Sequence, residues 1–444
     1  MTIESRPSGP CFAVKTSALA ALLAFTCSIA PWSGASAHKY SFHTLYAFCP
    51  QAGCADGEFP EATLLMDQQG NLYGTTVTYG ASGQSQAGTV FELIPNGKRW
   101  KHRTLYSFCS QANCADGDNP TGNLIIDASG TLYGTTLEGG PYDNDAGVVF
   151  ELLPTDRKWK YKQLYAFCGP NYPQCEDGTF LRGGLTYAGA ASGQPYDGVS
   201  PLFGNTVLGG AGQGNGVAFR LDPQNRRWRE TVLYSFCSSP SCTDGGQPYD
   251  TPVMDSAGRL FGTTTIGGGT SGGLGGTVYS ITGMNESVTY AFCPASGCAD
   301  GAEPTAPVVL DNEGHIFGAA LEGGAGNPRS GVLFVISGSS EQVLHSFCSE
   351  ANCADGVYPQ AGVIADASGN LFGATLYGGN NDHGVVYEFS GGTERVLHTF
   401  CTEAGCPDGS NPYGGLVMDA AGNIYGTTEY GGANGGGTVF ELQY

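Results

Sequence analysis

Residues 105–120, LYSFCSQANCADGDNP, carry the pattern that decides the fold, because this pattern occurs seven times along the chain. Each copy ends an apolar stretch, closes a short loop between two cysteines, and reaches Asp-Gly two residues after the second cysteine. A proline stands three residues after that Gly in six copies, and the third copy has Leu181 there instead. The period of roughly 53 to 70 residues indicates a repeat architecture.

Four strands are predicted between one cysteine loop and the next. Residues 123–127 and 131–136 flank the turn at 128–130, as the two strands of a β-hairpin do. A glycine-rich loop follows, and residues 148–152 and 160–167 then form two more stretches rich in residues that favour strands. No stretch beyond residue 37 has a helical period. Four strands repeated at nearly even spacing predict an all-β protein, a β-propeller with one blade per copy.

The two ends of the chain complement each other. Residues 40–49, YSFHTLYAFC, form a lone copy of the fourth strand, and residues 413–444 supply a first, second and third strand. We therefore predict a seven-bladed ring, a single domain of residues 38–444, in which the N-terminal strand completes the last blade. Closure of this kind removes exposed sheet edges, whereas an open solenoid would need distinct caps.

Residues 1–37 have the composition of a secretory signal peptide. Arg6 and Lys15 give a basic start, residues 17–30 are apolar, and the small residues at 35–37 form a cleavage site. The alternative is a retained anchor helix, but the apolar run is too short to span a bilayer. We predict an exported protein, secreted, periplasmic or at the cell surface, with no transmembrane segment in the mature chain.

The cysteines are expected to form disulfides. Two of the 16, Cys11 and Cys27, lie in the predicted signal peptide, and the rest form seven close pairs. Paired cysteines in an oxidising compartment indicate disulfides. Zinc is the alternative, but it requires four ligands from two neighbouring loops, and seven pairs leave a remainder. The predicted bonds join Cys49 to Cys54, Cys109 to Cys114, Cys168 to Cys175, Cys237 to Cys242, Cys293 to Cys298, Cys348 to Cys353, and Cys401 to Cys406.

Several further blocks recur in order within each copy. Residues 408–442 contain DG, a proline, LVMD, GNIYGTT, GG and GTVFEL. This order resembles the GloVer tandem repeats of secreted bacterial proteins (choice-of-anchor GloVer repeats), and the resemblance covers nearly all of residues 40–444. The chain departs from that family in lacking a C-terminal anchor and in its weakened third copy. The resemblance implies an exported, propeller-like repeat protein, and it implies no activity.

One face of the predicted ring carries a basic and aromatic sector. The turns between the third and fourth strands share a face with the hairpin turns. Three consecutive turns of this kind each contain one tryptophan, and together they contain eleven of the chain's 19 Lys and Arg. The formal net charge of the chain is −21, so this clustering of positive charge is unusual. The tryptophans either pack on their own blades or stack on sugars of an acidic polysaccharide or anionic cell surface. The candidate binding residues are Trp100, Trp159, Trp228, Arg99, Lys158 and Arg227.

The opposite face carries the cysteine loops, the glycine-rich loops and the Asp of each Asp-Gly pair. Each Asp either caps its own turn or, as the alternative, helps to bind Ca²⁺, although no copy has an EF-hand spacing. We expect no cofactor. Asp382 and His383, unique to the sixth copy, are weak candidates for a metal or catalytic site. His345 and His398 replace the Tyr of LYSFC and are expected to be strand variants.

These features favour an exported scaffold for binding or adhesion to glycans or cell-surface polymers, without catalysis. The alternatives are a polysaccharide-active hydrolase or lyase with its site in the propeller mouth, and a structural cell-surface component. We expect a monomer whose partner is a polysaccharide or a cell-surface protein. Nucleic acid is not an expected partner, because an isoelectric point of about 4.5 gives a field that repels it.

Overall fold

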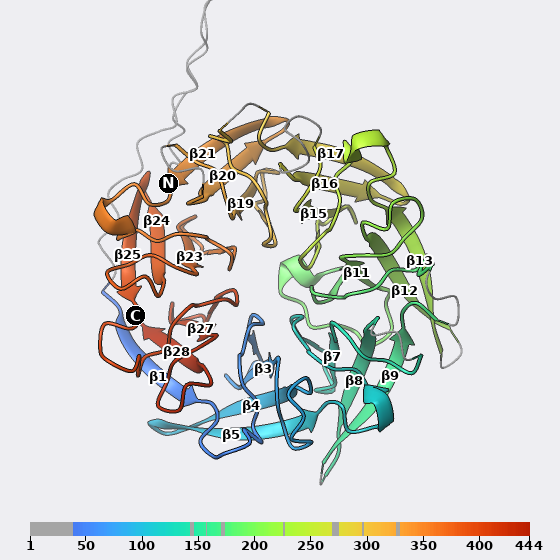
Figure 1. Cartoon of the computed structure of the whole chain (residues 1–444), viewed down its shortest axis with the longest axis vertical. Coiled ribbons are helices and arrows are strands. Elements are labelled where there is room, and N and C mark those ends of the chain that lie inside the picture. The colour runs from blue at the N-terminus through green and yellow to red at the C-terminus, as the bar shows by residue number, and fades with distance from the viewer. Residues whose placement is uncertain are drawn as a thin grey trace, which may run out of the picture. The chain divides into compact units, whose positions relative to one another are not determined.

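The computed structural model describes residues 39–142, 146–156, 158–169, 174–224, 227–268, 275–294, 297–325 and 329–444. These residues form seven four-stranded antiparallel sheets that stand as blades around a ring (Figure 1). The prediction of an all-β, seven-bladed β-propeller is confirmed. The predicted signal peptide, residues 1–37, lies outside the described residues.

Every blade has the same strand order from the centre of the ring outwards. The first strands are β2 (Leu65–Met66), β6 (Ile125–Ile126), β10 (Thr186–Tyr187), β14 (Val253–Met254), β18 (Val309–Leu310), β22 (Val363–Ala365) and β26 (Val417–Met418). The second strands are β3 (Leu72–Thr76), β7 (Leu132–Thr135), β11 (Leu202–Thr206), β15 (Leu260–Thr264), β19 (Ile316–Ala320), β23 (Leu371–Thr375) and β27 (Ile424–Thr428).

The two outer strands of each blade are longer. The third strands are β4 (Thr89–Asn96), β8 (Val148–Pro154), β12 (Val217–Gln224), β16 (Thr277–Thr282), β20 (Val332–Ser337), β24 (Val385–Ser390) and β28 (Thr438–Gln443). The fourth strands are β5 (Arg99–Ser107), β9 (Trp159–Ala166), β13 (Arg227–Ser235), β17 (Asn285–Ala291), β21 (Ser340–Ser346), β25 (Thr393–Thr399) and β1 (Ser41–Ala47). Short 3₁₀ turns are η1 (Ala112–Cys114), η2 (Ala190–Ser192), η3 (Pro240–Cys242) and η4 (Ala351–Cys353).

The innermost strands are shorter than predicted. Residues 123–127 were expected to be extended and paired, but β6 contains only Ile125 and Ile126. The residues before it bond to the neighbouring blade instead, since Asn123 Oδ1 accepts a hydrogen bond from the backbone N–H of Thr63 at 3.0 Å. Near the axis the chain therefore links blades rather than extending its own sheet.

The N-terminal strand closes the ring. β1 is the outer strand of the last blade and pairs antiparallel with β28, from Ser41 opposite Gln443 to Ala47 opposite Thr438. Figure 1 shows the blue β1 beside the red β28. This outcome confirms the predicted closure, in which the two ends of the chain share one sheet.

The glycine of each second strand sets the packing inside a blade. In blade one, a Cβ added to Gly74 would lie 2.6 Å from Cζ of Phe91, and in blade seven a Cβ on Gly426 would lie 2.5 Å from Cζ of Phe440. The aromatic ring of the third strand thus occupies the space that a side chain would need. The recurrence of Gly in this block reflects contact within a blade.

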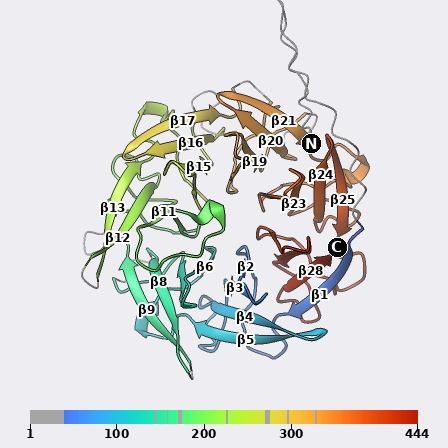
Figure 2. The same ribbon diagram turned by 180° about the vertical axis from the view of Figure 1, so that it is seen from behind.

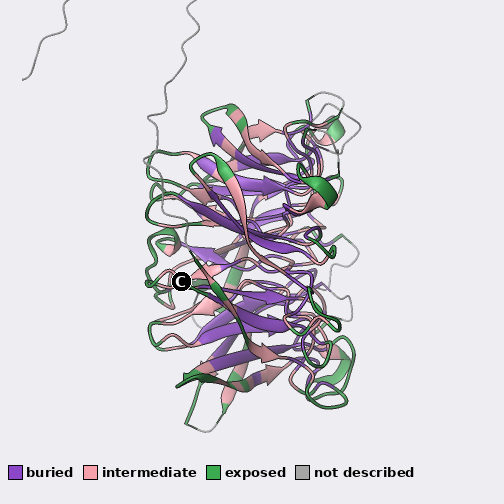
Figure 3. Cartoon of the chain, turned by 90° about the vertical axis from the view of Figure 1, so that its left-hand side faces the viewer, coloured by how far each residue is buried: buried purple, intermediate pink, exposed green. Residues whose placement is uncertain are grey.

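The hydrophobic core is divided among the interfaces between neighbouring blades. Tyr73 and Val90 of blade one, for example, form one buried cluster with Leu132 and Phe150 of blade two. Seen from the side, the buried strands lie between two layers of exposed loops (Figure 3). Each blade is therefore stabilised chiefly by its two neighbours, and the loops on the two faces are free to carry different groups.

Candidate functional site

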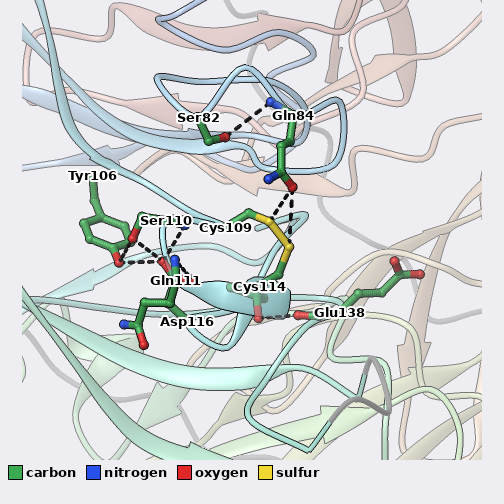
Figure 4. Close-up of a disulfide and its surroundings, with 10 residues drawn as sticks. Ser82, Gln84, Tyr106, Cys109, Ser110, Gln111, Cys114, Asp116 and Glu138 are labelled. Atoms are coloured by element: carbon green, nitrogen blue, oxygen red, sulfur yellow. Dashed lines mark hydrogen bonds between the residues drawn. A yellow bond between two sulfur atoms is a disulfide. The ribbon is translucent and has the colours of Figure 1, made fainter.

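Each cysteine loop is organised by its Asp-Gly aspartate. In the second copy of the loop, Asp116 Oδ2 accepts hydrogen bonds from Tyr106 Oη at 2.6 Å and from the backbone N–H of Ser110 at 3.1 Å, and Oδ1 accepts one from the N–H of Gln111 at 3.1 Å (Figure 4). The carboxylate fills its lone pairs within its own loop. This arrangement matches the interpretation that each Asp caps its turn.

Histidine replaces tyrosine in two of these loops without changing the arrangement. His345 Nε2 lies 3.1 Å from Asp355 Oδ2, and His398 Nε2 lies 3.0 Å from Asp408 Oδ2. Burial raises the pKa of Asp355, but hydrogen bonds from His345 and Ser349 outweigh it and hold that pKa at about 2. Both histidines act as strand variants that support the loop.

All seven predicted disulfides are present, one in each cysteine loop. His383 lies near Cys401 and Cys406, but those two cysteines are bonded to each other. Asp382 Oδ1 accepts a hydrogen bond from the N–H of Gly378 at 2.9 Å. A metal at His383 would compete with a disulfide for sulfur, so these residues support no metal assignment.

The three predicted tryptophans lie at the starts of consecutive fourth strands, and all are half-buried. They pair across their hairpins with prolines, as Trp100 with Pro95, Trp159 with Pro154, and Trp228 with Pro223. Each one packs against a core cluster between two blades. The charged candidates Arg99, Lys158 and Arg227 are exposed. The tryptophans thus have a packing role, and their binding role stays a prediction.

A groove lies beside one of these tryptophans. Its volume is about 700 Å³, within the range of pockets for small ligands. The lining includes Trp159, Pro154 and the exposed side chains of Gln68, Gln69 and Ser129. Among the described residues that line it, Trp159 is the one tryptophan. Trp159 therefore lines a groove whereas Trp100 and Trp228 do not line it, although all three hold the same position in their repeats.

The irregular third copy builds one wall of this groove. Its extra residues contribute Tyr187, Ala190 and Gln194 to the lining, and η2 lies toward the centre of the ring in Figure 2. The segment is fixed on blade two, since the N–H of Tyr196 donates to the backbone O of Ile126 at 3.1 Å. Tyr187 Oη donates to the backbone O of Gln194 at 2.6 Å. The length of this insertion was the visible sequence signal for a special site.

A second site lies on the axis of the ring, toward the cysteine-loop face. All seven blades contribute to a chamber of about 50 Å³. Its key residues directly follow the proline position of each Asp-Gly-x-x-Pro block, a position at which the copies differ. The occupants from blade one to blade seven are Glu61, Thr121, Arg182, Tyr249, Thr305, Gln360 and Tyr413. Sequence reasoning missed this chamber because it followed what the copies share, whereas the signal was one variable position inside a constant block.

Arg182, which belongs to blade three, contacts blades one, four and seven inside this axial chamber. Its Nη2 lies 3.4 Å from Glu61 Oε2 of blade one and donates a hydrogen bond to Tyr413 Oη of blade seven. Gln360 Nε2 donates to the same Tyr413 oxygen. The guanidinium carbon lies 4.7 Å from the ring centre of Tyr249. A single cation is thus held among aromatic rings on the axis.

Two carboxyl groups of the chamber are shifted toward their neutral form. Burial raises the pKa of Glu61 to about 7, and Arg182 only partly opposes that rise. Burial also raises the pKa of Asp250 to about 7, against a hydrogen bond from the N–H of Thr251 at 2.5 Å. The balance of charge in the chamber therefore changes near neutral pH.

Comparison with known families accounts for the repeat. The model described as the Gloeobacter/Verrucomicrobia repeat matches residues 35–200, 187–354 and 346–444. The chain belongs to the Gloeobacter/Verrucomicrobia repeat family. The matches cover all seven blades of this family member, and the resemblance drawn from the sequence blocks is confirmed. Comparison with the sequences of curated proteins gives no match.

Among the solved structures similar to this Gloeobacter/Verrucomicrobia repeat protein, one with a TM-score above 0.5 supports its fold alone. The β-propeller domain of Cps50 (Swd1) from Myceliophteria thermophila has a TM-score of 0.51 at 12% identity, over 91% of this chain and 100% of that one. A Dyadobacter fermentans protein of unknown function has a TM-score of 0.43 at 11% identity, over 91% and 99%. Trypanosoma rangeli sialidase has a TM-score of 0.40 at 9% identity, over 87% and 55%.

The described residues of this family member contain no helix with the length and apolar character needed to cross a membrane. Seven disulfides are typical of proteins that fold in an oxidising compartment. The disulfides are consistent with an extracellular protein.

Proposed function

We propose that this protein is an exported scaffold that binds an acidic polysaccharide in the groove beside Trp159. The observation that carries the proposal is the combination of an aromatic side chain with exposed amides in a space of about 700 Å³. Sugar rings present apolar faces and rims of hydroxyl groups, so they suit a surface of this kind. Lys158, the exposed sequence neighbour of Trp159, supplies a positive charge outside the lining and favours a glycan that carries negative charge. The lining itself includes Asp67 and Asp127, whose carboxylates accept hydrogen bonds from the backbone of their own turns.

A polysaccharide hydrolase with a site in the channel mouth has weaker support. The two carboxyl groups with raised pKa, Glu61 and Asp250, share the axial chamber. A chamber of about 50 Å³ holds on the order of three or four waters, which is too little for a sugar ring on each side of a scissile bond. Binding without turnover is therefore the preferred function.

The test compares two tryptophan variants on one panel of polysaccharides. Trp159→Ala should weaken binding to polygalacturonate roughly tenfold, because stacking on an aromatic face contributes about 1 kcal/mol or more. Trp100→Ala is the matched control, since it removes the same side chain from the same hairpin position one blade away. Affinity electrophoresis of the folded variants measures the effect. Equal loss in both variants, or product release by the wild type, would contradict the proposal.

A further inference from the structure

The axial chamber contains a buried hydroxyl group without a partner. Thr305 is 8% exposed, and its Oγ1 has no hydrogen-bond partner within the described parts of the chain. Leaving such a group unsatisfied is destabilising, because it loses its hydrogen bonds to water. Because Thr305 lines the chamber, a polar group inside the chamber is expected to satisfy it.

Arg182, the cation of the chamber, is fixed in position, but its contact with the carboxylate of Glu61 is long. Arg182 is held between two rings, with its guanidinium carbon 4.7 Å from the centre of Tyr249 and 5.5 Å from that of Tyr413. Its contact with Glu61 spans 3.4 Å, whereas charge-assisted hydrogen bonds of this type measure about 2.7–2.9 Å. A carboxylate with better geometry would compete for Arg182.

The charged and titratable groups around Arg182 come from several blades. They are Glu61, Asp250, Glu429, Tyr249 and Tyr413, and Tyr430 interacts in turn with Glu429 and Glu61. Burial raises the pKa of Glu61 and of Asp250 to about 7 and also raises that of Glu429. Below neutral pH Glu61 and Asp250 lose their charge and become donors, so the charge of Arg182 then dominates the chamber.

The size of the chamber limits what enters it. Its volume of about 50 Å³ accommodates a carboxylate group but not a pyranose ring. Tyr430 is 44% exposed and interacts electrostatically with Glu61 of the chamber, and its ring centre lies 5.1 Å from that of Phe59. A sugar whose carboxylate reached Arg182 would therefore keep its ring outside the chamber.

We propose that the axial chamber binds a carboxylate group, carried by an acidic sugar or by a small organic acid, with Arg182 as its cation. Gln360 and Thr305 donate hydrogen bonds to the bound group, and Glu61 is the internal anion that it displaces. This site lies on the cysteine-loop face, so it is independent of the groove, which the hairpin turns form on the other face.

Calorimetry with small probes tests this proposal on the full folded chain. At pH 5.5, D-galacturonate should bind and D-galactose, which lacks the carboxylate, should not. Acetate that binds as tightly as galacturonate would assign the site to small organic acids, and tighter galacturonate would assign it to acidic sugars. Arg182→Gln should lower the affinity roughly tenfold or more. Arg329 lies in the loop between β19 and β20, one of the glycine-rich loops of the same face, and does not line the chamber. Arg329→Gln removes an equal charge and should change the affinity little.

A second variant keeps the test valid if Arg182→Gln fails to fold. Glu61→Gln removes the competing anion, so it should tighten galacturonate binding at pH 8 and reduce the difference between pH 8 and pH 5.5. A merely structural defect would not tighten binding. The proposal is overturned if galactose binds as well as galacturonate, if no acid binds at pH 5.5, or if Glu61→Gln leaves the pH dependence unchanged.

Discussion

Gly134 illustrates how one missing side chain determines the packing of a blade. A Cβ at this position would lie 2.7 Å from Cζ of Phe150 and 2.8 Å from Cδ2 of Leu124. Gly134→Ala should therefore destabilise the protein by about 1–3 kcal/mol, as overpacking of a tight core does. Thermal unfolding measures the change. Gly169→Ala is the control, because a Cβ there meets nothing within 4 Å; equal shifts in both variants would contradict the packing argument.

Single residues also mark the limit of what the sequence reveals. The aspartate of each Asp-Gly pair was predicted to cap its turn, because a local turn needs only local neighbours. Arg182 was not predicted to meet Glu61 and Tyr413, since those residues are brought together only by the circular arrangement of the blades. Residues that are far apart in the sequence and meet on the axis share no local sequence pattern from which their contact could be predicted.

The fourth strands form a pH-sensitive element around the ring. Four of them place a half-buried glutamate against the cysteine-loop aspartate of the preceding blade. Burial, followed by the charge of that aspartate, raises the pKa to about 8 for Glu230 and Glu394 and to about 7 for Glu286 and Glu341. These carboxyl groups bind a proton more tightly in the folded state than at their ordinary pKa of 4.5.

Stability should consequently fall as pH rises from 6.5 to 8.5. The contribution of these glutamates is complete below about pH 4.5 and is lost through their folded pKa values, because the folded state then releases the protons that favoured it. Melting temperatures across this range measure the effect. Replacing all four with Gln should reduce the slope to what Glu61 and Asp250 contribute, and an unchanged slope would assign the pH dependence to other groups. His102 acts in the opposite sense, but its pKa is lowered to about 4 by burial, so it matters below this range.

Among the strands, the sequence predicts which ones are present better than it predicts how long each one is. The fourth strand expected at residues 160–167 is found as β9, because alternation of exposed and buried side chains identifies an outer strand. The first strands are shorter than expected, since their leading residues bond to the next blade. The groove beside Trp159 was not predicted, because it needs the insertion of blade three to fold onto blade two.

The whole molecule depends on the sheet shared by its two ends. Removing residues 38–47 deletes β1 and exposes the edge of β28, so the melting temperature should fall and association between chains should increase. Thermal unfolding and size-exclusion chromatography measure both effects. Adding a synthetic peptide of residues 39–48 should restore the monomer. A truncated chain that melts like the full chain would show that closure contributes little to stability.

This shared sheet also sets an order in time. Of the strands in the ring, β1 leaves the ribosome first, and its partner β28 leaves last. The other six blades can each pair their strands within one copy of the repeat, whereas the last blade must wait for nearly the entire chain. Contacts of such long range form late, because the ends of a long loop must first meet. The ring can therefore close only after β28 has been made, and a chain that stops before β28 cannot form the last blade.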